Sequence, residues 1–442
     1  MARAPRLGAH FVLKGLLTLI ILALGTSTFA LATPVVDLYG LYQNTKSGKY
    51  LLLFLNNSEI RPGGGFIGSF ARVQFEDGAI KDLAVETNIY KRDNAFITEN
   101  IVEPPEPLRR VNHEGRWALH DANWYPDFAD SAQHVQWFYE HGAPKSESID
   151  GVIGITLTAA EALVKLTGPI YIPEQNLTVT HENFFAQIQY EVEKGYYAQE
   201  ENININEPKT IIANLIPPFL EKIKKTNAVT LARYVARLAR EKQIVFWFGN
   251  AQNQQRVEKW NWAGRVPTDP EPIFAVVNAN LDQAKSSRSI RQHTDIDEQT
   301  VGAARFTNVR ITRTHVGSYS WPDGDDANYL EIIVPSDAQL NAILVNGADI
   351  GKNPFLLETN PQGFPIMQKV SSTLRYGQKI IGFWADTAVG QSTVVELSYA
   401  SSISIRSKTR VLKQVGATEE TLRLIRDDRV LFDGALEADF TR

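Results

Sequence analysis

The spacing of hydrophobic residues changes along the chain and divides it into regions. An uninterrupted apolar run at 51–55 is typical of a strand that is covered on both faces. Helical periodicity dominates the middle of the chain, and strands that alternate apolar and polar residues begin at about residue 301. The pattern therefore predicts an α/β domain with a mixed sheet and flanking helices over 49–295, followed by an all-β sandwich of immunoglobulin-like size over 296–442.

Several local signals place elements within these regions. Asp77-Gly78 lies between two strand-like runs and predicts a tight hairpin. A helix capped by Asp130 is expected through about 140, and Thr158 with Glu161 forms a capping-box pattern that predicts a helix ending at Gly168. That helix lies between apolar segments at 149–155 and 169–172, an order that predicts a βαβ unit. Further predicted elements are helices at 182–193, 209–225 and 229–242 and strands at 244–248, 273–278, 309–313, 329–334, 379–383 and 393–397.

The N-terminus has the pattern of a membrane anchor. A basic flank over 1–14 precedes an uncharged run over 15–36, which is long enough as a helix to cross a bilayer. Basic residues stay on the cytoplasmic side, so the chain beyond a linker at 37–48 is expected outside the cytoplasmic membrane. Ala30-Leu31-Ala32 also resembles a cleavage site, which leaves a removable signal peptide and a secreted protein as the alternative.

Composition excludes several classes of function. The 442 residues contain no cysteine, which rules out disulfides, thiolate nucleophiles and cysteine-ligated zinc. The net charge of −5 is mild and favours no class of partner, but the absence of a basic stripe with interleaved aromatics argues against a nucleic-acid partner. The eight histidines show no metal-binding HExxH spacing.

The first candidate site follows the apolar run at 51–55. Asn57, Glu59 and Arg61 would lie beyond the carboxyl end of a sheet strand, where ligands of α/β sheets bind, and three glycines follow them. Arginine binds phosphate through its planar fork, so Arg61 is the candidate cation for a phosphorylated ligand. The alternatives are a salt bridge between Arg61 and an acid such as Glu59, and a connection that is merely rich in turn-forming residues.

Two other segments supply candidate partners. Asp121 and Asn123 are candidates to bind Mg²⁺ or to hold the substrate, since hard oxygen ligands suit that ion. Both residues are equally suited to capping the backbone of a long loop. Asn280 and Lys285 follow another apolar strand and are expected either on the same rim or in a helix or loop cap.

Five short motifs resemble a bacterial family known as domain of unknown function 4012. The first is the segment 56–69 itself, and Asp121-Ala122-Asn123-Trp124 with the following Pro-Asp-Phe resembles the second. Segments at 150–153, 277–281 and 413–416 resemble the remaining three, so the similarity extends from about Lys49 to the C-terminus. The family usually has arginine where this chain has His120, which puts a permanent positive charge before Asp121 in doubt. It also has proline where this chain has Val415.

The predicted layout is also similar to that of the LytR-CpsA-Psr phosphotransferases of bacterial envelopes. Those enzymes move glycopolymers from a polyprenyl-pyrophosphate carrier to the wall, with arginines on the pyrophosphate and Mg²⁺ on aspartates. This resemblance is one of architecture and does not include the Ile-Pro-Arg-Asp type of segment that those enzymes carry. A phosphotransfer site needs a cation for the transferred group and an acid or metal ligand, so Arg61 and Asp121 are the candidate catalytic residues. Asn57, Glu59, Asn123, Asn280 and Lys285 are the candidate substrate contacts. The alternative is a non-catalytic envelope module that binds wall polymer or partner proteins.

Overall fold

The chain folds into two compact units that interleave along the sequence. The computed structural model describes residues 2–3, 40–41, 43–111, 115–142, 146–268, 271–282, 284–352, 354–359, 363, 365–402 and 408–442. Among them, the α/β unit comprises the residues up to Asn56, Phe66–Ile101 and Ala118–Arg265. The β unit comprises Asn57–Gly65, Val102–Trp117 and Val266–Arg442.

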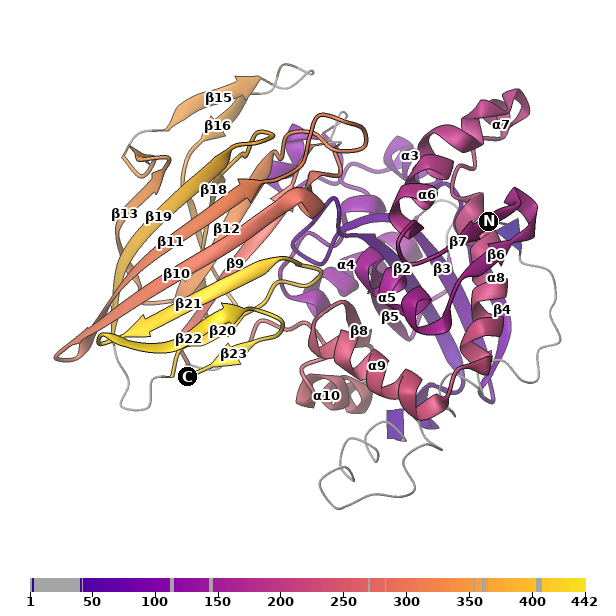
Figure 1. The fold of residues 1–442 in the computed structure, drawn as a ribbon, viewed down its shortest axis with the longest axis horizontal. Coiled ribbons are helices and arrows are strands. Elements are labelled where there is room, and N and C mark those ends of the chain that lie inside the picture. Colours follow the sequence, from indigo (N-terminus) through magenta and orange to yellow (C-terminus); the bar gives the residue numbers. More distant parts are fainter. Residues whose placement is uncertain are drawn as a thin grey trace. The chain divides into compact units, whose positions relative to one another are not determined.

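A mixed six-stranded sheet forms the centre of the α/β unit (Figure 1). Its strand order is β1-β4-β3-β2-β5-β8, in which β2 and β5 are parallel and the other pairs are antiparallel. The bounds are β1 Ala2–Arg3, β2 Gly48–Asn56, β3 Phe66–Glu76, β4 Ala79–Val85, β5 Gly151–Thr156 and β8 Ile244–Phe248. Asp77 and Gly78 join β3 to β4 with positive φ angles of 50° and 80°, which confirms the predicted hairpin.

Helices cover both faces of this sheet. Leu53 of β2 lies opposite Phe70 of β3, and the Phe70 ring meets Tyr139 of the helix α4 edge-on at 5.7 Å. The other face carries Ile153 of β5, which packs in a cluster with Leu163 of α5 and residues of α9. On that second face Leu52 and Phe54 of β2 are only partly buried, so the prediction of a strand covered on both faces holds in part. The helices of the unit are α3 Ile89–Glu99, α4 Phe128–His141, α5 Leu157–Thr167, α6 Phe184–Tyr190, α7 Glu200–Ile205, α8 Thr210–Lys225, α9 Ala228–Arg240 and α10 Ala251–Lys259.

Two predicted helix caps are wrong by a few residues. The side chain of Asp127, not Asp130, accepts the first backbone N–H groups of α4, and Thr156, not Thr158, caps α5. In both cases a capping residue lies just before the predicted one, and it is the earlier side chain that has the extended backbone of an N-cap.

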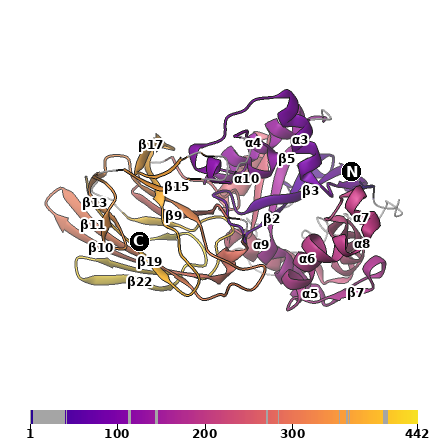
Figure 2. The same ribbon diagram turned by 90° about the horizontal axis from the view of Figure 1, so that it is seen from above.

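The predicted βαβ unit is also wrong. The segment after α5, β6 (Ile170–Ile172), pairs with β7 (Leu177–Val179) in a separate two-stranded sheet instead of joining β5. The cluster around this hairpin includes residues of α5, α6 and α8, and these elements lie together in both views (Figures 1 and 2). Short helical turns complete the unit: η3 Leu119–Asp121, η4 Pro173–Gln175, η5 Glu191–Gly195 and η6 Tyr196–Ala198.

Two β-sheets form the β unit. One has seven strands in the order β14-β13-β19-β11-β10-β21-β22, and the other has six in the order β17-β18-β12-β9-β20-β23. The first sheet contains β10 Ile290–Val301, β11 Ala304–His315, β13 Gln339–Val345, β14 Ala348–Asp349, β19 Ser392–Ser402, β21 Glu420–Arg426 and β22 Arg429–Ala435. The second contains β9 Ile273–Asn280, β12 Asn328–Pro335, β17 Ser371–Arg375, β18 Gln378–Trp384, β20 Arg410–Leu412 and β23 Phe440–Thr441. Outside these sheets are the hairpin β15 Phe355–Thr359 with β16 Pro365–Gln368, and the turns η2 Glu106–Arg110 and η7 Ser286–Ser289.

One hydrophobic core joins the two sheets. It brings Ile296 of β10 and Val395 of β19 together with Leu330 of β12 and Phe383 of β18, all at most 1% exposed. Burial alternates along β10 and β19, as the sequence predicts for a sandwich, although three inward residues of β10 are polar. By contrast, β12 and β18 are buried along almost their whole length. Thirteen strands make the sandwich larger than the seven to nine of an immunoglobulin domain, and β10 with β21 and β9 with β20 are parallel pairs.

The units differ from the predicted domains in two respects. The segments Asn57–Gly65 and Val102–Trp117 were predicted within the α/β domain but belong to the β unit. The sequence pattern predicts the segment 273–278 as a strand of the α/β sheet and a boundary at 295, but this strand is β9, in the middle of the second β-sheet, and residue 295 lies within β10.

The predicted anchor at 15–36 lies outside the described residues. Within the residues that the structure describes, no helix is long and apolar enough to cross a membrane.

Candidate functional site

Five of the seven predicted site residues belong to the β unit, where they meet in one polar cluster. The loop Asn57–Gly65, here called the motif loop, leaves β2 and packs against the segments that follow β9 and β20. The backbone N–H of Asn280 donates to the carbonyl of Ile60 at 3.0 Å, and that of Ser287 donates to the carbonyl of Ser58 at 3.1 Å. The motif loop is therefore bonded into the β unit along its backbone.

Arg61 lies in the centre of this cluster and is 3% exposed. Its guanidinium donates to the backbone carbonyl of Asn280, and its own carbonyl accepts a hydrogen bond from the side chain of Gln414 at 3.1 Å. Because Gln414 also donates to the carbonyl of Asn278, it joins the motif loop to the end of β9. These contacts assign Arg61 to the interior of the β unit.

The other members of the cluster are also bonded within the unit. Glu59 pairs with Lys285, each side chain 10% exposed, whereas the sequence alternative was a salt bridge between Glu59 and Arg61. Asn57 donates to the carbonyl of Gly416 at 2.8 Å. Asn280 is fully buried and donates to the hydroxyl of Ser286 at 2.9 Å. Buried polar groups need such partners, so these bonds fix the loop in place.

The close approach of two glycines explains part of the motif. Gly416 has a φ of 77°, and a Cβ added there would lie 2.2 Å from the carbonyl oxygen of Gly64. Gly64 itself has a φ of 118°, which side chains rarely allow. The glycines of the first and last motifs can therefore approach each other this closely because neither carries a side chain.

Asp121 and Asn123, the two remaining predicted residues, belong to the α/β unit. Asp121 ends η3, is 3% exposed, and its carboxylate lies 3.4 Å from Nε2 of His120. On the other side of this imidazole, Nδ1 lies 2.7 Å from the carboxylate of Asp93, which also accepts the backbone N–H groups of Leu119 and His120. Asn123 is fully buried beside these residues in sequence.

The two carboxylates keep His120 positively charged. Burial lowers the pKa of this imidazole, but Asp121 and Asp93 outweigh burial and raise the pKa to about 10. His120 is therefore a cation at neutral pH.

The acids around His120 do not fit a magnesium site. Asp93 and Asp121 both direct oxygens toward the imidazole, whose charge takes the place that a metal ion would have. Among the described residues, no group of three His, Cys, Asp or Glu side chains could hold a metal ion.

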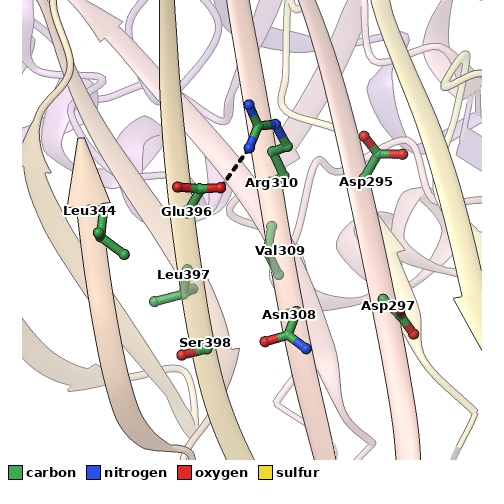
Figure 3. A pocket seen from close by; sticks show the side chains of 9 residues that line it. All are labelled: Asp295, Asp297, Asn308, Val309, Arg310, Leu344, Glu396, Leu397 and Ser398. Atoms are coloured by element: carbon green, nitrogen blue, oxygen red, sulfur yellow. Dashed lines mark hydrogen bonds and ion pairs between the residues drawn. The ribbon is translucent and has the colours of Figure 1, made fainter. Parts of the chain in front are cut away.

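A hollow that the sequence prediction missed lies on the seven-stranded sheet of the β unit (Figure 3). It has a volume of about 470 Å³. Its lining residues come from β10, β11, β13 and β19 and are Asp295, Asp297, Asn308, Val309, Arg310, Leu344, Glu396, Leu397 and Ser398. The alternation of polar residues in β10 and β11 was a signal for an outward polar face, but neighbouring strands could not be paired from sequence alone.

Taken together, these features define a two-unit protein with a mixed α/β sheet, a large two-sheet β unit and a hollow on one β-sheet. Residues 46–192 match the model of the family described as protein of unknown function (DUF4012). The resemblance to LytR-CpsA-Psr enzymes is not shown. No curated protein matches the chain.

Solved structures with partial similarity include a putative nutrient binding protein from Legionella pneumophila, with 9% identity and a TM-score of 0.23 over 36% of this chain and 54% of that one. Native yeast LTA4 hydrolase has 8% identity and a TM-score of 0.18 over 32% and 23%. An M1 zinc metallopeptidase mutant from Deinococcus radiodurans has 13% identity and a TM-score of 0.17 over 31% of each chain. This chain thus spans about half or less of each of these proteins, and TM-scores this low do not establish a shared fold.

Proposed function

We propose that this protein is a membrane-anchored, extracytoplasmic protein of the bacterial cell envelope that binds a glycan of the wall without transferring it. The anchor and the location are expectations from the basic flank at 1–14 and the uncharged run at 15–36. Binding without transfer is the second of the two functions that the sequence suggests.

The observation that carries this choice is the position of Arg61. A phosphotransferase needs a cation that reaches the transferred phosphoryl group. Arg61, the candidate for that role, is 3% exposed and donates to the backbone carbonyl of Asn280. Moving its guanidinium to a substrate would leave that buried carbonyl without this donor, which is unfavourable.

The surroundings of Asp121 also favour binding over transfer. Its carboxylate and that of Asp93 flank the charged imidazole of His120 and do not converge on a metal position. Binding or transfer of a polyprenyl-phosphate-linked glycan stays a prediction from the similarity in layout to the LytR-CpsA-Psr enzymes.

Two assays on the full chain separate the two functions. Co-sedimentation with purified bacterial wall sacculi measures binding, and incubation with a polyprenyl-pyrophosphate-linked glycan and Mg²⁺ measures transfer. The proposal predicts retention on sacculi and no transfer. Transfer that Arg61→Lys abolishes in a variant with wild-type thermal stability would contradict it, and so would a failure of the wild-type chain to bind sacculi.

A further inference from the structure

The outer face of the seven-stranded sheet carries ordered rows of polar side chains. Side chains on a strand alternate between faces, so the exposed positions of β11, Phe306, Asn308 and Arg310, all point away from the core. The register sets Arg310 between Asp295 of β10 and Glu396 of β19. Arg310 Nη1 lies 2.5 Å from a carboxylate oxygen of Glu396 (Figure 3).

The next two rows differ in chemistry. Asn308 lies between Asp297 and Ser398, and these three residues line the hollow together with the first row. Phe306 lies one row further along, between Gln299 and Ala400, and is 43% exposed. Alternate residues of a strand are about 7 Å apart, so the three rows form a strip about 14 Å long with an aromatic ring at one end.

We propose that this strip, running along β11 from Phe306 to Arg310, binds a glycan chain that is neutral or carries amino groups. This inference rests on the proposed function and names its site and ligand class. The Phe306 ring offers an apolar surface to the C–H face of one sugar. Carboxylate, amide and guanidinium groups of the two polar rows then offer donors and acceptors to the hydroxyls of the next sugars.

The charge of the strip selects among wall polymers. Asp295, Asp297 and Glu396 outnumber Arg310, so the lining of the hollow is negative at neutral pH. The register places Arg423 of β21 beside Asp295. Arg423 pairs with Asp433 at 3.9 Å, so the two together do not change the net charge of this face. Like charges close together repel, so polymers rich in phosphate are disfavoured, whereas hydroxyls and ammonium groups are accepted.

The same side chains would also be present if they served only the stability of the sheet. Cross-strand ion pairs on an exposed face contribute little, about 0.2–1 kcal/mol each. This alternative gives no reason for an effect of Phe306 or Asn308 on glycan binding, which makes the two readings separable.

Isothermal titration calorimetry on the full chain tests the proposal. The probes are the neutral tetramer of N-acetylglucosamine, its deacetylated amino form and poly(glycerol phosphate). The variants are Phe306→Ala and Asn308→Ala, and the matched control is Phe355→Ala in β15, because Phe355 is 46% exposed and lies outside this strip. Thermal denaturation checks that each variant is folded.

The expected result is binding of the neutral or amino tetramer, weakened about tenfold by Phe306→Ala and unchanged by Phe355→Ala. If both strip variants bind the tetramer as tightly as the wild type, this site is wrong. In that case binding of the wild-type chain to sacculi still supports the proposed function. Preference for poly(glycerol phosphate) overturns the ligand class. If the wild-type chain binds neither these probes nor sacculi, the proposed function fails together with this site.

Discussion

The motif loop and the outer face of the seven-stranded sheet are both rich in charged and amide side chains, but the partners of these side chains differ. In the motif loop, Arg61 and Asn57 donate to backbone carbonyls of the β unit and are at most 7% exposed. On the outer face, Arg310 and Glu396 are about half exposed and pair across strands. The first cluster holds the fold together, whereas the second remains accessible to solvent and to a ligand.

A polar, glycine-rich motif that contains an arginine is therefore not by itself evidence of a ligand site. What decides its role is whether the polar groups are already satisfied by buried backbone. Four predictions test this distinction, beginning with the largest effect.

Gly416→Ala is expected to destabilise the β unit most. The added Cβ would lie 2.2 Å from the carbonyl oxygen of Gly64, so the motif loop must move in addition to the strain of the positive φ. Together these effects are expected to cost about 4 kcal/mol in the free energy of unfolding. Gly390→Ala is the matched control, since Gly390 has a φ of 73° and nothing within 4 Å of its added Cβ. Equal shifts in the thermal midpoints of the two variants would refute the close packing of the motif loop.

Arg61→Ala is expected to cost about 3 kcal/mol, because it removes a charged donor from a buried carbonyl. The paired variant Arg310→Ala removes an arginine from the outer face, and its cost is expected below about 1 kcal/mol. Chemical denaturation of both variants measures the difference. If Arg61→Ala unfolds at the wild-type denaturant concentration, Arg61 is available for a ligand and the comparison fails.

The cluster around His120 is an intermediate case, with the histidine side chain 21% exposed. Because the pKa of His120 is raised to about 10, the stability it contributes is full below the unfolded value near 6.5 and is lost as the pH rises through about 10. His120→Arg retains its charge over this range. The wild-type chain is therefore expected to lose about 2 kcal/mol between pH 7 and pH 10 that the variant keeps.

Thermal midpoints of the α/β unit at several pH values measure this difference. Superimposable pH profiles of the wild type and His120→Arg would show that the imidazole is not held charged by Asp93 and Asp121.

The smallest effect is expected for Glu396→Gln on the outer face. It removes the charge that pairs with Arg310, and exposed pairs contribute less than about 1 kcal/mol. The thermal midpoint should stay within error of the wild type, and high salt should erase any residual difference, because salt screens exposed charges. A loss comparable with that of Arg61→Ala would mean that the outer face is as structural as the motif loop.

The sequence predicted local elements well and long-range partners poorly. The Asp77-Gly78 hairpin and the strand cores at 309–313 and 379–383 follow from turn chemistry and alternation, both of which are local. The assignment of the strand at 273–278 depended on which sheet it joins, and a continuous apolar run fits a central strand of either kind.

The candidate site shows the same limit. From the sequence, the approach of Asn280 and Lys285 to the segment 57–61 was one of two alternatives, and Asp121 and Asn123 were expected at the same site. Sequence reasoning expected these residues around a ligand, because burial and backbone partners such as the carbonyl of Asn280 cannot be read from residue types. The outer face was missed because its rows come from strands that only the register brings side by side.

Hydroxyl-radical footprinting of the full chain, with and without the N-acetylglucosamine tetramer, tests the central comparison most directly. We expect Ile60 of the motif loop to be oxidised slowly in both samples, because it is only 6% exposed. We also expect the tetramer to reduce oxidation of Phe306 and to leave that of Phe355 unchanged. Protection of Ile60 by the tetramer, or oxidation of Phe306 at the same rate in both samples, would contradict this comparison.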